Sequence, residues 1–429
     1  MTIVVLVVTL LIGGSVSKKM DDSLKVAKQI GTLSSTVPSE AQAKEELQYI
    51  EKFAQDADQV DLLMAKASQR ELICYDPVIL PEPTEKSTQV YNVFGRNYRK
   101  AIESLLTRIN AKDAPSDAEI RSQTGVGTGG GTMTGMMPMN PTPGAAGASS
   151  AMVDAVCLKR ADEIPVYANP SIFNWYGYWE NFVYKSVDES LQNCWSSQIA
   201  YWVYEDVVQS IETINSGSSR VSESPVKRLL GVQFNGPVQV FSSQSMGFGM
   251  GGMEPMGMMP GYTGGPAMLD APVYVKTVSP FMQIPWTGRM CNDQIDVIHF
   301  AVSVITDSSA TTLFMKELCS AKPHTYREGF LDKGKQETAS HNQITVMEYE
   351  IEPIIKTDAV HAYYRYGNSA VVRLNLVCEY VFSRKGYDAI KPAPVKKSLG
   401  QDAGTGQTGT GTTDPGAGGA PGTPGGIMM

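Results

Sequence analysis

Three stretches of this sequence match the glycine spacing G-x-G-x-x-G, which in dinucleotide-binding proteins forms a tight loop around a pyrophosphate. The loop works only when a strand precedes it and the N-terminus of a helix follows it. Here the first match follows a polar helical stretch, and no helix is expected before about Ala148. All three matches lie in glycine-rich, low-complexity sequence, so we explain them by composition and predict no cofactor site. They are Gly125, Gly127 and Gly130; Gly247, Gly249 and Gly252; and Gly404, Gly406 and Gly409.

Two methionine clusters raise a second chemical possibility, because thioethers are soft ligands for Cu(I). Neither cluster has an interleaved Cys or His, and the spacing is irregular. We therefore favour adaptable loops over a metal site, and keep a periplasmic binding or Cu(I)-handling module as the alternative function. The clusters are Met133, Met136, Met137 and Met139, and Met246, Met250, Met253, Met256, Met258 and Met259.

No arrangement of side chains typical of an active site is present. Histidines show no paired spacing, and neither a nucleophile elbow nor a P-loop occurs. His299 and His361 fall on the polar faces of expected strands, where we expect them to be solvated. Asp293 and Asp296 lie in a turn-like stretch with no partner in view. We predict no catalytic residues and no metal ligands, and keep a hydrolase with dispersed catalytic residues as a third hypothesis. The histidines are His299, His324, His341 and His361.

Composition and charge narrow the possible classes of function further. The net charge of −8 over 429 residues argues against a nucleic-acid partner. The 40 glycines and 25 prolines gather in three blocks, which leaves enough apolar sequence for one or two modest cores. The cysteines lack zinc-site spacing; disulfides stay open, and unpaired core cysteines are favoured. They are Cys74, Cys157, Cys194, Cys291, Cys319 and Cys378.

The expected structural elements begin at the N-terminus. Residues 1–17 contain an apolar segment, Ile3 to Ile12. It is shorter than the roughly twenty residues that span a bilayer. A truncated transmembrane anchor and a cleaved signal both fit, and we favour the anchor because the sequence after it is typical of a membrane-proximal coiled coil.

From Ala41 to Gln69 the chain has no Gly or Pro, and its apolar residues alternate in steps of three and four. That spacing is an a/d heptad seam, typical of helices that pair. It extends over only about three heptads, so a helix packed on its own domain is the alternative. The seam is Ile50, Phe53, Ala57, Val60, Met64 and Ala67.

Helices are expected next at Val93 to Ile109 and at Val187 to Asn215, the second as a core helix under a sheet. The C-terminal half reads as strand, helix, strand and strand. Strands are expected at 226–234, 298–304 and 347–352, followed by a hairpin of 359–365 with 371–382. In the third of these, Met347, Tyr349 and Ile351 share one face and Glu348, Glu350 and Glu352 the other, which we expect to be wet. The order predicts an α+β fold, a ferredoxin-like sandwich whose antiparallel sheet is covered on one side by helices.

We divide the chain into eight segments. They are an anchor at 1–17, a coiled-coil helix at 18–74, a Pro-rich connector and helix at 75–122, a low-complexity linker at 123–152, a helical and first-half ferredoxin-like region at 153–244, a Gly/Met loop at 245–267, a β-α-β-β region at 268–397 and a disordered tail at 398–429.

This layout resembles the PilO-like inner-membrane proteins of type IV pilus and type II secretion systems. The likeness rests on the anchor IVVLVVTLLI, the helix LQYIEKFAQDADQVDLLMAKA, and the segments DVIHFAVSVITDSSATTLFMKELCSAK, QITVMEYEIEP and AVVRLNLVCEYVF. It is a likeness of architecture, without a sharp motif, and the two Gly/Met/Pro loops and the tail depart from it.

The resemblance implies a structural protein rather than an enzyme. It would be a single-pass protein of the bacterial inner membrane with its soluble part in the periplasm. It would pair as a homodimer, or as a heterodimer with a similar anchored protein, and would bind neither nucleic acid nor a small-molecule substrate. The seam would pair with another helix, and the sheet edge or a helix face of the terminal domain would carry the second contact.

Overall fold

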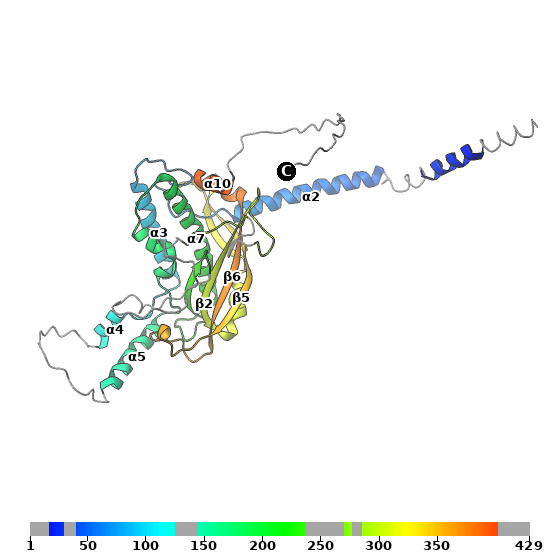
Figure 1. Cartoon of the computed structure of the whole chain (residues 1–429). Coiled ribbons are helices and arrows are strands. Elements are labelled where there is room, and N and C mark those ends of the chain that lie inside the picture. Colours follow the sequence, from blue (N-terminus) through cyan, green and yellow to red (C-terminus); the bar gives the residue numbers. More distant parts are fainter. Residues whose placement is uncertain (1–16, 30–39, 125–144, 237–269, 277–284, 402–429) are drawn as a thin grey trace, which may run out of the picture. The chain divides into compact units, whose positions relative to one another are not determined.

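The computed structural model describes residues 17–29, 40–124, 145–236, 270–276 and 285–401 (Figure 1). The chain divides into two compact units, Met1–Gln69 and Arg70–Met429.

In the first unit, helix α2 (Glu40–Ala67) matches the predicted helix closely. Its sequence is rich in good helix formers, with Glu40 in the first turn and Lys66 in the last, where each charge complements the helix dipole. Residues 17–29 are also helical. None of the described helices is long and apolar enough to cross a bilayer. The predicted anchor lies outside the described residues, except for Ser17.

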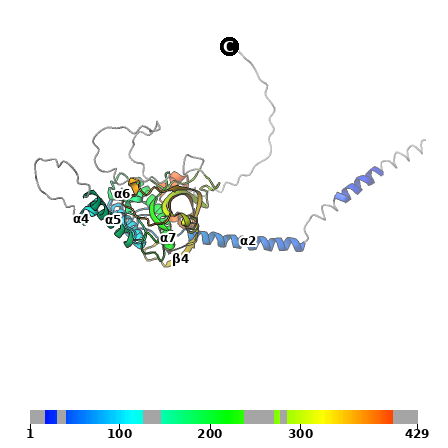
Figure 2. The same cartoon turned by 90° about the horizontal axis from the view of Figure 1, so that it is seen from below.

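The second unit begins three residues after α2, so its globular part starts within the segment that we assigned to the coiled coil. Its longer helices and its strands are α3 (Gln89–Arg108), α4 (Asp117–Thr124), α5 (Ala145–Glu163), α6 (Asn174–Glu180), α7 (Val187–Ile214), β1 (Val226–Gln233), β2 (Ile295–Asp307), α8 (Thr311–Leu318), β3 (Lys322–Arg327), β4 (Gln336–His341), β5 (Ile344–Pro353), β6 (Val371–Ser383), α9 (Arg384–Tyr387) and α10 (Ala393–Leu399). Helices α4 and α5 lie side by side (Figures 1 and 2).

Four strands form one sheet in the order β1-β2-β6-β5, and every neighbouring pair is antiparallel. Because β2 and β5 each run antiparallel to β6, they are parallel to one another, and the chain passes between them through α8. This is a split β-α-β unit. The hairpin β3–β4, which we did not predict, is inserted between α8 and β5. The predicted mixed α+β class with an antiparallel sheet is confirmed.

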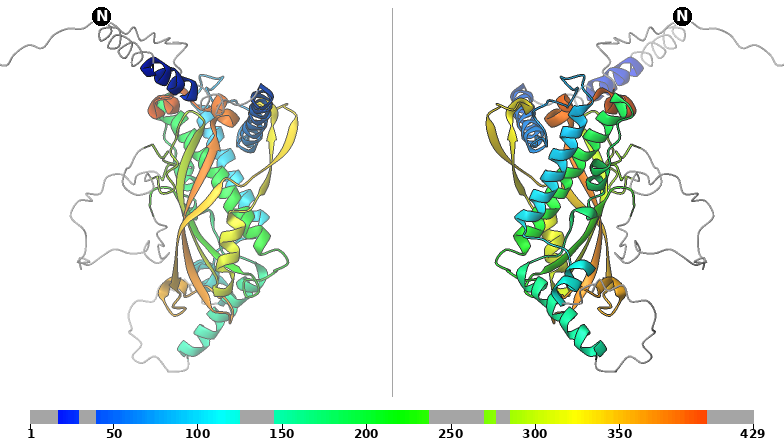
Figure 3. Two further views of the ribbon diagram at one scale, coloured as in Figure 1. Left: turned by 90° about the vertical axis from the view of Figure 1, so that its right-hand side faces the viewer. Right: turned by 90° about the vertical axis from the view of Figure 1, so that its left-hand side faces the viewer.

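Helices α3 and α7 lie together against one face of the sheet (Figure 3). Ser186 caps α7, its Oγ accepting a hydrogen bond from the N–H of Glu189 at 3.2 Å. The helix then buries Trp195, Trp202 and Tyr204, and the Trp202 ring lies 6.1 Å from that of Phe382 on β6. The prediction of a core helix under the sheet is confirmed.

Strand β2 differs from the prediction because both of its faces are buried. On the second face, Ala301 and Ile305 pack with Tyr167 and with Ala161 from the end of α5. Polar residues alternate with apolar ones in this strand, which indicated a solvent-exposed second face. Instead, Tyr167 and the end of α5 cover that face.

The predicted hairpin is wrong. Residues 359–365 form no strand: a 3-10 turn spans Ala359–His361, and β6 pairs with β2 and β5 instead. Tyr364 packs edge-on against Tyr167 at 5.0 Å, and Arg228 stacks 3.6 Å above the Tyr364 ring. These contacts hold the segment across the second face of the sheet rather than at its edge.

Candidate interaction surfaces

The seam predicted on α2 is exposed along the helix. No residue of α2 is buried, and Phe53 and Val60 are 65% and 54% exposed. Ile50 and Met64 are exposed as well, as is Ala57, while Ala67 is half-buried. Within the first unit, no described residue packs over this stripe.

The stripe is wider than the six predicted positions. With Ile50 and Ala57 at heptad position a, Leu47 falls at e and both Tyr49 and Leu63 fall at g, and these three are exposed too. Most of the stability of helices in proteins comes from packing of an apolar face rather than from intrinsic propensity. Burying one large apolar side chain contributes about 1.5–3 kcal/mol, so pairing would stabilise the helix substantially.

A second exposed apolar surface lies on β5, an edge strand of the sheet. Tyr349 and Ile351 stand opposite Leu376 and Leu374 of β6, on the face that carries the core, yet they are 59% and 46% exposed. We expected this face to be the buried one. Helix α8 lies beside β5 without covering them, and its own Leu313 is exposed.

The two edges of the sheet differ. At β1, Tyr167 covers the edge: its N–H donates to the carbonyl of Lys227 and its carbonyl accepts from the N–H of Leu229, both at 2.9 Å. Within the part of the chain that the structure describes, the backbone of β5 pairs only with β6. An edge strand turns alternate N–H and C=O groups outward, so β5 offers a template for an added strand.

The remaining face of β5 is acidic. Glu348, Glu350 and Glu352 stand opposite Val377, Asn375 and Arg373 of β6. Arg373 Nη1 lies 3.3 Å from Glu352 Oε2. No ion pair between described residues involves Glu348 or Glu350, and both are exposed. The predicted wet face is confirmed.

Sequence reasoning missed a buried ionic cluster around Arg70, the first residue of the second unit. The two terminal nitrogens of its guanidinium donate to Asp206 of α7 at 3.2 and 2.9 Å, and Nη1 also donates to the Tyr380 hydroxyl of β6 at 2.9 Å. His341 Nε2 lies 2.8 Å from Arg70 Nη1 and 3.3 Å from Asp206 Oδ1.

Electrostatics in this cluster favour the ion pair. Burial alone would raise the pKa of the Asp206 carboxyl, but the charges of Arg70 and His341 hold that pKa well below its usual range. Burial, and then the Asp206 charge, raise the pKa of Tyr380 well above its ordinary value. Because the arginine, aspartate and tyrosine are all buried, we interpret the cluster as a tie between α7, β6 and the start of the unit.

Three sequence expectations about polar residues are wrong. His299 is fully buried on β2, with Nε2 3.3 Å from Glu379 Oε2, and His361 is buried with Nδ1 3.0 Å from the Tyr366 hydroxyl. Asp296, expected without a partner, is buried and 2.6 Å from Lys391 Nζ. The partners of His299 and Asp296 lie 80 and 95 residues away in the sequence, so no local pattern indicated them.

Burial and charge shift the pKa values of two of these groups. Burial, and then the Arg228 charge, lower the pKa of His361. Burial would raise the pKa of Glu379, but hydrogen bonds from His299 and Thr287, with the Arg289 charge, lower it. Glu379 lies in the sheet on β6, whereas His361 lies in the 3-10 turn Ala359–His361.

The chemical sites that we considered from the sequence find no support in the described residues. Among them, no three His, Cys, Asp or Glu side chains converge as a metal site. All six cysteines are free. The first two glycine fingerprints, both methionine clusters and the tail glycines lie outside the described residues.

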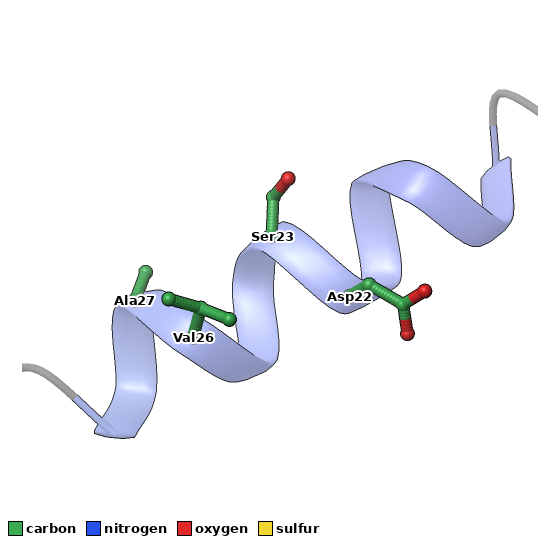
Figure 4. A pocket seen from close by; sticks show the side chains of 4 residues that line it. All are labelled: Asp22, Ser23, Val26 and Ala27. Carbon is green, nitrogen blue, oxygen red and sulfur yellow. The ribbon is translucent and has the colours of Figure 1, made fainter.

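A shallow hollow lies on the helix of residues 17–29, bordered by Asp22, Ser23, Val26 and Ala27 (Figure 4). All four side chains come from one helix and are exposed, so the hollow is a space between neighbouring turns. We assign it no binding role.

No protein-family model matches this chain, and no curated protein or solved structure is similar enough to count as a match.

Proposed function

We propose that this protein is a non-enzymatic scaffold of a type IV pilus or type II secretion inner-membrane subcomplex, similar to the PilO-like proteins. In this proposal residues 1–17 anchor it to the bacterial inner membrane, its soluble part lies in the periplasm, and it acts by pairing with a second chain.

The observation that carries the proposal is the uncovered stripe on α2. A soluble helix that keeps Phe53 and Val60 exposed needs a partner to bury them, and the a/d spacing suits another helix. The order of elements in the second unit supports a ferredoxin-like assignment, because a split β-α-β unit is preceded by a helix and a strand. Along the chain the order is α7, β1, β2, α8, β5 and β6. Its open edge at β5 offers the second contact.

The test compares seam variants with a matched control in the full chain, purified in mild detergent. Phe53→Asp and Val60→Asp each place a charge in the seam, whereas Gln55→Asp places the same charge at heptad position f of the same helix. Sedimentation should show the parent and Gln55→Asp associated and both seam variants at least tenfold weaker, because charged side chains at a and d positions desolvate unfavourably.

Cross-linking gives the geometry. Val60→Cys should form an interchain disulfide under mild oxidation, since d positions of paired helices meet, and Gln55→Cys should not. If both seam variants sediment like the parent, helix pairing is wrong and the scaffold proposal loses its basis. The membrane part is tested separately: the full chain should stay with the membrane fraction through an alkaline wash, and a variant lacking residues 1–17 should be released.

A further inference from the structure

The regular part of the β5 edge is short, and its two faces differ in chemistry. A bulge interrupts the β5–β6 register between Val346 and Glu348, and Pro353 ends the strand, so the residues from Glu348 to Glu352 form the uninterrupted stretch. One face of this stretch carries three carboxylates, and the other carries Tyr349 and Ile351, both exposed. An added strand would therefore meet carboxylates on one side and apolar surface on the other.

A second copy of this chain suits that edge poorly. Two β5 strands joined in one sheet by a closed two-fold axis run antiparallel with their like faces on the same side. Each carboxylate would then stand opposite another, with Cβ atoms about 4.5–5.5 Å apart, an arrangement that destabilises strand pairs. On β6, Arg373 stands beside the three carboxylates of β5, and it already pairs with Glu352.

We propose that β5 accepts an extended strand from a different protein, one with Lys or Arg at every second position and apolar residues between them. Basic side chains would pair with Glu348 and Glu350, and the apolar ones would cover Tyr349 and Ile351. The inference rests on the proposed scaffold function and names the chemistry of its second contact: helix α2 pairs through its seam, and the sheet edge recruits a basic strand.

The test uses the full chain and a capped nine-residue peptide that alternates lysine and valine. Fluorescence anisotropy should show saturable binding that weakens as salt rises. Glu350→Lys should weaken binding about tenfold, because an attractive cross-strand pair becomes a repulsive one. Glu85→Lys, which makes the same change at an exposed position before α3, should leave binding within about twofold of the parent.

Two further peptides separate strand addition from charge attraction. The same sequence with alternate backbone nitrogens methylated keeps its charge but loses the N–H donors that face β5, so it should not bind. A peptide that alternates glutamate and valine should not bind either. If the methylated peptide binds as well as the parent peptide, or Glu350→Lys has no effect, the proposal is overturned.

The result also distinguishes this inference from the proposed function. Phe53→Asp alters the seam and leaves β5 untouched, so that variant should still bind the basic peptide. If no peptide binds, and Tyr349→Lys abolishes a self-association that Phe53→Asp leaves intact, then a second copy covers the edge and a basic partner is excluded.

Discussion

Replacing Arg70 by Met should lower the free energy of unfolding of the second unit by about 3 kcal/mol. Met keeps the aliphatic length of the side chain but removes both guanidinium contacts with Asp206, at 3.2 and 2.9 Å. Removing one partner of a buried pair usually costs about 3–5 kcal/mol, because a charge stays buried without compensation. We expect the lower end, since Asp206 keeps the Tyr380 hydroxyl at 2.8 Å and His341 at 3.3 Å.

A double variant tests the reasoning behind that number. Arg70→Met combined with Asp206→Leu removes both buried charges, so it should be more stable than Arg70→Met alone. Urea unfolding followed by tryptophan fluorescence measures this, because Trp202 is buried on the same helix as Asp206. The control is Lys185→Met, which breaks the exposed Lys185–Glu189 pair at 2.7 Å and should cost less than about 1 kcal/mol.

The pH dependence gives an independent check with a defined sign. The pKa of Asp206 is depressed in the folded protein, so its contribution to stability is fully present above the unfolded value, near 3.8, and is lost as pH falls below it. Arg70→Met should therefore lose less stability than the parent on acidification below pH 4. A loss under about 1 kcal/mol at neutral pH, with an unchanged acid profile, would refute the cluster as a structural tie.

Two further predictions concern packing and thiol chemistry. Gly95→Ala should destabilise the unit by about 1–3 kcal/mol, because the added Cβ would lie 2.8 Å from Cε3 of the buried Trp179 ring. Gly177→Ala, where a Cβ meets open space in helix α6, should instead be neutral or stabilising by up to about 1 kcal/mol in the same urea assay. Burial raises the pKa of the Cys291 thiol to about 11. Its alkylation rate, followed by mass spectrometry, should therefore rise about tenfold per pH unit through pH 10, and a plateau near pH 9 would contradict the environment described for it.

The sequence predicted the elements whose apolar residues repeat with a clear period. Helix α7 carries its large side chains at steps of three and four, and β6 carries an apolar residue at every second position from Val372 to Phe382. The predicted bounds of both elements therefore agree with the structure within about two residues. Helix α2 was predicted equally well, because the chain has no Gly or Pro from Ala41 to Gln69 and its apolar residues recur in steps of three and four.

The polar interior could not be predicted in the same way. Arg70 and Asp206 are 136 residues apart, and Asp296 and Lys391 are 95 apart, so no local pattern links either pair. Periodicity treats a polar residue as solvent-facing, and it therefore misplaced His299, whose partner Glu379 stands directly opposite on β6. Tyr349 shows the opposite error, because an apolar residue expected to be buried is exposed. Strand alternation shows which side chains share a face, but not whether anything covers that face.

Two of the buried ionic pairs lie where the chain enters and leaves the described part of the second unit. Arg70 is its first residue and ties to α7 and β6. At the other end Lys391 and Gln401 both bond to Asp296 of β2. Buried pairs of this kind add little to stability compared with apolar packing, but they tolerate few alternative partners and so fix where a segment attaches. Under the proposed function, a displacement of the chain at Arg70 would act directly on Tyr380 of β6 through their hydrogen bond. Because β6 pairs with the edge strand β5, that displacement would reach the open edge of the sheet.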